Sequence, residues 1–537
     1  MKKLVSLAIT ASLSLSAMAQ DAYDAANLAS QDLNGTARYV GMGGALDALG
    51  ADISTISSNP AGIGLFRSSM GSFTLSVVNQ EDAVKFQSAN PTNLSFDQIG
   101  FVWSNEGYDS YLNFGFNFHK SRNFNHILTA ANAFRPSDIK TDGTGNITYL
   151  VGGGQNIATD IKRNNKLLDS DNQDANGFNY YESQLDNLYF NLLWFDKGDG
   201  TYSYYPLTAS DFNFRKGNTG YIGVYDLNIS GNSNNRVYWG LTVGIHDVHY
   251  ESATRYTETL EPGHPLPNGI IPSEAGIIDE RTIKGQGVDL KAGIIFRPIA
   301  ESPFRIGISI ATPTWYDLKT RNFTTCFVDE RRNDGEEYNF KYYTPWKFGL
   351  SLGHTIGNML ALGAGYEFQD FSSADMRYIT EKHYDGDDSR SDEDMNSEIG
   401  YCLKGTHTLR LGAELKPDPT LAIRLGYNFV SSQYGDNNHA YRNQEVYSPG
   451  VYYASTSDYT NWKATHRITA GLGTRIGDLS LDLAYQYSVT NGDFFPYADG
   501  QYYESDKTIL KYEEMTCPST PVSLKRHQVL FTMGYRF

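Results

Sequence analysis

The chain has 537 residues and a formal net charge of −17, and 20% of its residues are charged while 13% are aromatic. This excess of acid argues against nucleic acid as a partner and fits a surface protein with acidic, solvated loops. The three cysteines have no metal-binding spacing, so neither a metal nor another cofactor is expected. Cys326 and Cys517 fall in predicted loops and could form a disulfide, although single thiols fit equally well.

Residues 1–19 are typical of a secretory signal peptide. Lys2 and Lys3 precede an apolar run, and small residues close the segment before Gln20. Beyond this segment no run of about 18 apolar residues occurs, so no membrane-spanning helix is predicted. We therefore expect an exported chain that can cross a membrane only with strands.

The segment 20–67 is rich in glycine and has a helical apolar period. We expect its helix to end at Asn59 and Pro60, because the residue before a proline avoids the α conformation. Asn59 is expected to cap a further short turn with Pro60 at its first position. A small helical unit ahead of a long stranded region, 68–537, predicts a plug inside a β-barrel. The residues that set the helical period are Leu46, Leu49, Ile53 and Ile56.

A nucleotide-binding loop is the alternative interpretation of the glycines at Gly41, Gly43 and Gly44. The dinucleotide fingerprint requires a glycine three residues after Gly43, where Leu46 stands, and a preceding strand, which the pattern does not show. We therefore expect these glycines to let the plug pack closely against a barrel wall.

The region from residue 68 onward shows about fourteen segments with the apolar–polar alternation of strands. Single-chain outer-membrane barrels have an even number of strands, short periplasmic turns and long external loops. Short and long connections alternate in this sequence, which favours a membrane barrel over a soluble β-sandwich. The predicted strands are 69–79, 95–105, 110–121, 218–230, 236–256, 283–297, 303–323, 338–355, 359–378, 400–416, 419–433, 462–476, 479–490 and 524–537.

The last predicted strand ends in an aromatic residue, Phe537, on its apolar face. We expect this residue to contact the barrel assembly machinery. In lipid every strand needs two partners, so the barrel must close on itself. The expected setting is the outer membrane of a Gram-negative bacterium, with a monomer in contact with membrane lipids and lipopolysaccharide.

The polar faces of the predicted strands carry more basic than acidic residues. Two interpretations stay open. The bases could pair with acids of the wall and with Asp47 and Asp52 of the plug, or some could attract an anionic head group. The candidate head-group contacts are Arg305, Arg410, Arg424 and Arg467.

The connection 135–217 is far longer than an ordinary loop, which indicates a functional or partly structured segment. It contains a helical pattern that is apolar nearly all round and would need to be covered. This helix is either a lip packed on the barrel rim or a landing site for lipophiles. Its candidate residues are Leu185, Leu188, Leu192, Trp194 and Phe195.

The third predicted strand, 110–121, contains a break in phase. Its alternation would place Lys120 and Arg122 toward lipid, and the apolar residues after Asn123 shift to the other parity. A one-residue slip flips every following side chain, so the chain must bulge, kink or leave the sheet. The strand could simply end near His119, or the break could open a window to the membrane.

The triplet Asn59-Pro60-Ala61 resembles the Asn-Pro-Ala motif in the hatch of FadL-type outer-membrane transporters of long-chain fatty acids and other hydrophobic compounds. Residues 287–293, 309–313 and 406–429 are similar to strands of that family. The resemblance covers nearly the whole mature chain and implies fourteen strands around a hatch. It also implies passive diffusion of a lipophile from the outer loops to a pocket above the hatch, and then sideways through a gap at the third strand.

The sequence leaves alternatives to this function. Some members of the resembled family are described as haemin receptors, for which His119 and His246 on the polar face are the candidates. An enzyme is not expected, because no spacing of Ser, His and Asp stands out. The plug argues against an open porin, which leaves a plugged, porin-like structural barrel as a further alternative.

Overall fold

The computed structural model describes residues 22–107, 110–133, 139–141, 147–150, 188, 192, 194–196, 202–204, 209–260, 266, 269–328, 331–381, 387–435, 459–496, 500–506, 509–515 and 519–537. The predicted signal peptide, Gln20 and Cys517 lie outside these ranges. The predicted cleavage and the possible disulfide therefore stay predictions.

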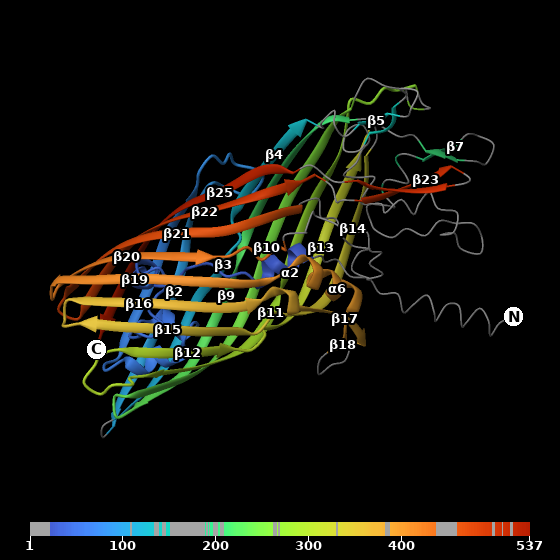
Figure 1. Cartoon of the computed structure of the whole chain (residues 1–537). Helices are drawn as coiled ribbons and strands as arrows, with labels where there is room; N and C mark the ends of the chain where they lie inside the picture. The colour runs from blue at the N-terminus through green and yellow to red at the C-terminus, as the bar shows by residue number, and fades with distance from the viewer. Residues whose placement is uncertain are drawn as a thin grey trace.

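The described residues form an antiparallel β-barrel of fourteen strands, in which several strands are interrupted and continue as a second segment (Figure 1). The first strand pairs with both the second and the last, which closes the barrel. The wall consists, in chain order, of β1 (Met70–Gln80), β2 (Thr92–Gly107), β3 (Ser110–Asn123) with β4 (His126–Ala133), β9 (Ala209–Ser233), β10 (Val237–Leu260), β11 (Glu274–Phe296), β12 (Arg305–Ala311) with β13 (Trp315–Phe327), β14 (Arg331–Tyr343) with β15 (Lys347–Ile356), β16 (Leu360–Asp370) with β17 (Asp375–Glu381), β18 (Asp388–Ser391) with β19 (Gly405–Asp418), β20 (Leu421–Val430), β21 (Tyr459–Ile476), β22 (Leu479–Phe495) and β25 (Thr520–Arg536).

Short strand pairs and one further helix lie beyond the wall. They are β5 (Ile139–Thr141) with β6 (Ile147–Leu150), β7 (Trp194–Asp196) with β8 (Tyr202–Tyr204), β23 (Gly500–Asp506) with β24 (Ile509–Met515), and α6 (Glu393–Cys402). No helix in the described part of the chain is long and apolar enough to cross a membrane.

The fourteen predicted strands are confirmed, and their boundaries need correction. The expected strands 303–323, 338–355 and 359–378 are each interrupted: Pro313 and Pro345 stand between the segments of the first two, and a short 3-10 turn, Phe371–Ser373, divides the third. Proline has no N–H to donate to a strand ladder, which explains the first two breaks. The expected strand 400–416 starts only at Gly405, because the preceding residues form α6. Cys326 lies within β13 and not in a loop.

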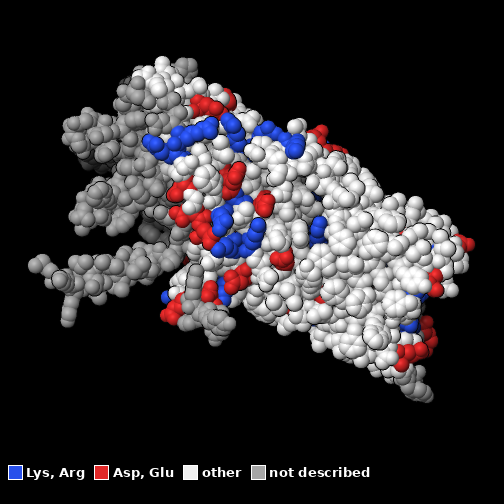
Figure 2. All heavy atoms as spheres, turned by 180° about the vertical axis from the view of Figure 1, so that it is seen from behind, with Lys and Arg blue, Asp and Glu red and all other residues white. Residues whose placement is uncertain are grey.

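The outer surface of the barrel is apolar and its inner surface is polar. On β10 the side chains of Val237, Leu241 and Ile245 are exposed, whereas those of Thr242 and His246 are buried in the lumen. Figure 2 shows a broad uncharged zone on the outside of the barrel, with Lys, Arg, Asp and Glu gathered toward the two ends. An outward apolar band of this kind is the surface that a transmembrane barrel presents to lipid.

Residues 22–66 lie inside the barrel and form a plug (Figure 1). It consists of α2 (Ala22–Ala29), α3 (Ala37–Gly41) and two 3-10 turns, η1 (Ile53–Ile56) and η2 (Pro60–Leu65). The continuous helix expected around residues 46–56 is wrong. Gly43, Gly44 and Gly50 adopt φ values of 62°, 80° and 62°, which interrupt a right-handed helix. The predicted cap is confirmed: the Asn59 side chain accepts a hydrogen bond from the Ala61 N–H, with Pro60 at the first position of η2.

Glycines of the plug and of the wall face one another at close range, as expected from the sequence. A Cβ added at Gly43 would lie 2.8 Å from the Tyr427 nitrogen and 2.9 Å from the Leu411 oxygen. On the wall, a Cβ at Gly412 would overlap the carbonyl oxygen of Met42. Backbone therefore packs on backbone where the plug meets β19 and β20, which leaves no room for side chains between them.

Candidate functional site

A cavity of about 260 Å³ lies in the lumen between the body of the plug and α2. Its floor includes Tyr39 and Ser58 of the plug, and Tyr23 of α2 contributes to its upper side. Eight basic side chains line the cavity, against three acidic ones. The basic residues are Arg122, Lys216, Lys291, Lys347, Arg410, Lys463, Arg467 and Arg526, and the acidic residues are Asp24, Asp32 and Glu367.

Asp32 of the plug stands at the centre of the positive charge. Its carboxylate lies 3.2 Å from Arg122, 3.5 Å from Arg526 and 3.7 Å from Arg467, and it accepts a hydrogen bond of 2.9 Å from the Asn123 N–H. Burial alone would raise the pKa of this carboxyl, but the three guanidinium charges and the backbone N–H lower it to about 2. One plug carboxylate therefore faces three arginines of the wall.

The four arginines expected to contact a head group fall into two pairs. Arg410 and Arg467 line the cavity: Arg410 binds Asp47 over 3.2 Å and Glu367 over 2.9 Å, and Arg467 approaches Asp32. The other two, Arg424 and Arg305, are absent from the described cavity lining, because they contact other groups. Arg424 binds Glu414 over 2.7 Å and Asp482 over 2.6 Å, and Arg305 donates to the carbonyl oxygen of Leu49 over 2.7 Å.

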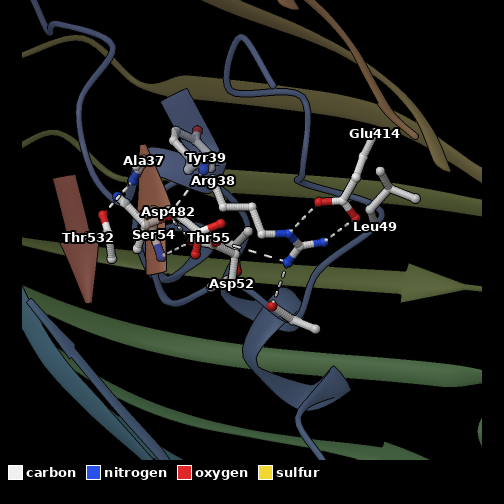
Figure 3. A network of polar contacts seen from close by, with 12 residues as sticks. Ala37, Arg38, Tyr39, Leu49, Asp52, Ser54, Thr55, Glu414, Asp482 and Thr532 are labelled. Carbon is white, nitrogen blue, oxygen red and sulfur yellow. Dashed lines mark hydrogen bonds and ion pairs between the residues drawn. The ribbon is translucent and has the colours of Figure 1, made fainter. Parts of the chain in front are cut away.

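The plug is anchored to the wall by a buried charge network around Arg38 of α3 (Figure 3). The Arg38 Nε donates to Glu414 of β19 over 3.1 Å, and Glu414 also accepts from Arg424. Nη1 of Arg38 lies 3.9 Å from Asp52 within the plug. The pairing of plug acids with wall bases is therefore found for Asp47, whereas Asp52 pairs with a base of the plug itself.

The triplet Asn59-Pro60-Ala61 is fully enclosed where the plug meets β10 and β11. A Cβ at Gly240 of β10 would overlap the carbonyl group of Pro60, and one at Gly293 of β11 would overlap the Asn59 side chain. The triplet therefore fills a niche made by two wall glycines, and none of its three residues lines the cavity, although the preceding Ser58 does.

The break in the third strand is confirmed. The pairing of β3 with β9 shifts register between Lys120 and Arg122, and β2 pairs with β3 only as far as His119. The plug occupies the edge that β2 leaves: the Asp32 N–H donates to the Ser121 oxygen over 2.8 Å, and the Asn34 amide donates to the Lys120 oxygen over 3.1 Å. The shift also turns Arg122 into the lumen, where the alternation of residues 110–121 would not have placed it.

The two histidines considered for haemin binding belong to a buried polar chain. His246 lies 3.0 Å from Asp289 through Nε2 and 3.1 Å from the Tyr316 hydroxyl through Nδ1, so both of its ring nitrogens are engaged. His119 lies 3.3 Å from Asp226. Among the described residues no group of His, Cys, Asp and Glu has an arrangement that could hold a metal ion.

The part of the lumen that surrounds α2 has an apolar wall, which this helix covers. The alanine face of this helix is buried against aromatic side chains of the wall, among them Phe124, Tyr250 and Phe340. The helix is held there by polar contacts as well: Arg281 binds Asp24 over 2.8 Å, and the Tyr342 hydroxyl donates to the Ala25 oxygen over 2.9 Å.

The expected landing helix is only partly described. Leu188 and Leu192 are helical and buried in an apolar cluster with wall residues such as Phe214. Trp194 and Phe195 lie in strand β7, so the helix does not extend over them as expected. Leu185 lies outside the described residues.

These observations define a transmembrane β-barrel that is closed by an N-terminal plug and holds a basic cavity. The chain is similar to the solved structure of a Pseudomonas aeruginosa FadL homologue, with 12% identity and a TM-score of 0.49 over 95% of this chain and 100% of the other. It is also similar to the Ralstonia pickettii toluene transporter TbuX, with 12% identity and a TM-score of 0.46 over 94% and 99% of the two chains. It is similar as well to the Pseudomonas putida toluene transporter TodX, with 11% identity and a TM-score of 0.45 over 95% of this chain and 100% of the other. No protein-family model and no curated protein matches the chain.

Proposed function

We propose that the protein is an outer-membrane channel for the passive uptake of hydrophobic compounds that carry an anionic head group, such as long-chain fatty acids. One observation carries the proposal: the lumen holds a basic cavity beside an apolar wall that a helix of the plug covers. An amphiphile with a charged head and an apolar tail matches both surfaces.

The head group is assigned to the arginines around Asp32. Three guanidinium groups surround this single carboxylate, so the cluster has an excess of positive charge. A carboxylate of a ligand can make the same charge-assisted hydrogen bonds as Asp32. Exchange of one carboxylate for the other then costs little, because the arginines keep a partner throughout.

The tail is assigned to the apolar wall that α2 occupies. The buried face of α2 consists largely of alanines, which have short side chains. Each CH₂ group transferred from water to an apolar site contributes about 0.8 kcal/mol, so a long alkyl chain gains more from this wall than the alanines do. A tail long enough for this gain to exceed the loss of the Arg281–Asp24 and Tyr342–Ala25 contacts therefore displaces α2.

The exit is assigned to the break in the third strand. Asp32 both balances the three arginines and, with Asn34, occupies the free edge of β3. A ligand that replaces Asp32 removes the plug from that edge as well. Binding of the head group and opening of the wall toward the membrane are then one event, and the ligand leaves sideways.

The proposal is tested by uptake into proteoliposomes without an energy source, with palmitate compared with hexadecanol, which has the same tail and no charge. Arg467→Gln together with Arg526→Gln should weaken palmitate binding about tenfold or more, because each pair removed is a charge-assisted hydrogen bond. Hexadecanol binding should change little. Arg475→Gln, at an exposed position of β21, is the matched control. An equal loss for both compounds, or no loss for palmitate, would refute the head-group assignment, and no uptake of either compound would support the structural barrel.

A further inference from the structure

Three histidines on the outside of the barrel share one arrangement that the channel function does not use. His407 of β19, His466 of β21 and His527 of β25 each accept or share a hydrogen bond with a tyrosine hydroxyl at Nδ1. The partners are Tyr366 at 2.7 Å, Tyr427 at 2.8 Å and Tyr485 at 2.7 Å, in the same order. Each imidazole also packs beside a second aromatic ring, with centroids 5.2, 5.3 and 4.9 Å apart for Phe368, Phe429 and Tyr487.

The three histidines lie at one height along the barrel axis. His466 is opposite Phe429, and Phe429 is opposite Leu409. His407 therefore lies two residues before the position on β19 that is directly across the sheet from His466, on the side away from the short turn. On the other side of His466, Val489 and then Lys525 are directly across the sheet, and His527 lies two residues after Lys525, toward the short turns, so the offset continues in the same sense. Two residues are about 7 Å along a strand and two strands are about 10 Å across, which corresponds to a tilt of about 35°. Strands of a barrel are tilted by about this angle from the barrel axis. The offset along the strands therefore compensates for the tilt, and the three histidines lie at the same height.

This height corresponds to the outer edge of the membrane. Each histidine stands about nine to eleven residues from the short-turn end of its strand, which is the length that a tilted strand needs to cross the hydrocarbon core. The next outward residues toward the short turns are Leu409, Ile468 and Val529, and all three are exposed and apolar. The imidazoles therefore face the level at which lipid head groups begin.

The arrangement at His527 shows the role of the second ring nitrogen, Nε2. Nε2 of His527 lies 2.6 Å from the carboxylate of Glu81. A carboxylate only accepts, so Nε2 carries a proton and presents an N–H to an anion. His407 and His466 hold their rings in the same way, yet within the described ranges no hydrogen-bond partner is found for their Nε2 atoms. Two copies of the motif thus present the donor without the anion.

We propose that His407 and His466 each bind the phosphate of a phosphorylated lipid in the outer leaflet, with its acyl chains against the apolar residues below. Glu81 takes the place of that phosphate at His527. The tyrosines are positioning residues: their hydroxyls fix Nδ1, so that Nε2–H points to the head group. Phosphate fits because it is an anion at this level of the bilayer and accepts hydrogen bonds from imidazole.

The test measures phosphorylated lipid A retained on the purified, folded protein by native mass spectrometry, with lipid A lacking its phosphates as the comparison. His407→Ala with His466→Ala should weaken retention of the phosphorylated form about tenfold per site and leave the other form unchanged. His527→Ala is the matched control and should have little effect. Tyr366→Phe with Tyr427→Phe should weaken retention less than the histidine pair does.

A gain of function keeps the test decisive if a histidine variant fails to fold. Glu81→Ala removes the acceptor at Nε2 of His527 and should add a third retained lipid. The proposal is overturned if the variant with both histidines replaced retains phosphorylated lipid as wild type does, if both forms of lipid A are lost equally, or if Glu81→Ala adds nothing. Inorganic phosphate at the same concentration should not displace the lipid, and displacement would show a free-phosphate site instead.

Discussion

The backbone N–H of Asp32 donates to the carbonyl oxygen of Ser121 over 2.8 Å, at the edge of β3 that β2 leaves without a partner. The plug thus completes the wall of the barrel as well as filling its lumen. Asn34 extends the contact, because its amide also donates to Asp97 of β2 over 3.2 Å. Any opening of this wall requires the segment that contains these two residues to leave.

A crosslink between the plug and β2 is expected to stop uptake. Asn34→Cys with Asp97→Cys, made in a variant with Cys326, Cys402 and Cys517 replaced by alanine, would hold the plug against the free edge of β3. Fatty acid uptake into proteoliposomes should fall when the disulfide forms and recover on reduction. A disulfide between residues 106 and 111, cross-strand partners on β2 and β3 far from the break, is the control and should leave uptake intact. Unchanged uptake with a complete 34–97 crosslink would exclude this exit.

The ionisation of Asp32 should make the closure of the pore by the plug depend on pH. Its pKa is lowered from 3.8 to about 2, so its stabilising contribution is complete above pH 4 and is lost as the pH falls toward 2. The shift corresponds to about 2 kcal/mol. In planar bilayers, Asp32→Asn should therefore leak more than wild type at pH 6, and the difference should disappear near pH 2. A difference that is constant over this range would show that the carboxylate charge is not what holds the segment.

The barrel could be predicted from the sequence because its signal is local and repeated. Apolar residues alternate on strand after strand, and one face must meet lipid, so the pattern has a single physical meaning. Strand ends were less predictable, although Pro313 and Pro345 are visible signals for two of the interruptions. The expected plug helix is wrong for a different reason: Leu46 and Ile56 are both buried, but they belong to two separate apolar clusters, and Gly50 between them adopts a left-handed conformation.

The site was harder to predict than the fold. Arg410 and Arg467 were found because a strand's parity shows which side chains face inward. Arg122 could not be assigned to the lumen by parity, because its orientation depends on a register shift that the sequence marks only as a break in phase. Asp32 has no periodic signal, since it lies in an irregular segment that gains its partners only when the barrel has closed.

A side chain at Gly240 should push the plug from its niche. A Cβ at this position would overlap the carbonyl group of Pro60, and backbone atoms cannot yield as a flexible side chain can. Gly240→Val should raise the single-channel leak toward that of a variant lacking residues 20–60, while the barrel keeps its heat-modifiable mobility in gels. Gly71→Val is the matched control, because a Cβ there would have its nearest neighbour at 3.8 Å. Equal leaks from the two variants would mean that this contact does not seal the pore.

The turn at Asn59 and Pro60 is expected to hold the plug in place and not to bind ligand. Asn59 caps η2, and loss of such a cap costs about 1 kcal/mol. Pro60 fixes its own φ and restricts Asn59, so its loss adds freedom to the unfolded turn. Asn59→Ala with Pro60→Ala should therefore raise the leak in bilayers while the affinity for palmitate changes less than twofold, since neither residue lines the cavity. Lower affinity without added leak would instead give this turn a direct role in binding, and the cavity around Asp32 would no longer account for the head-group contact.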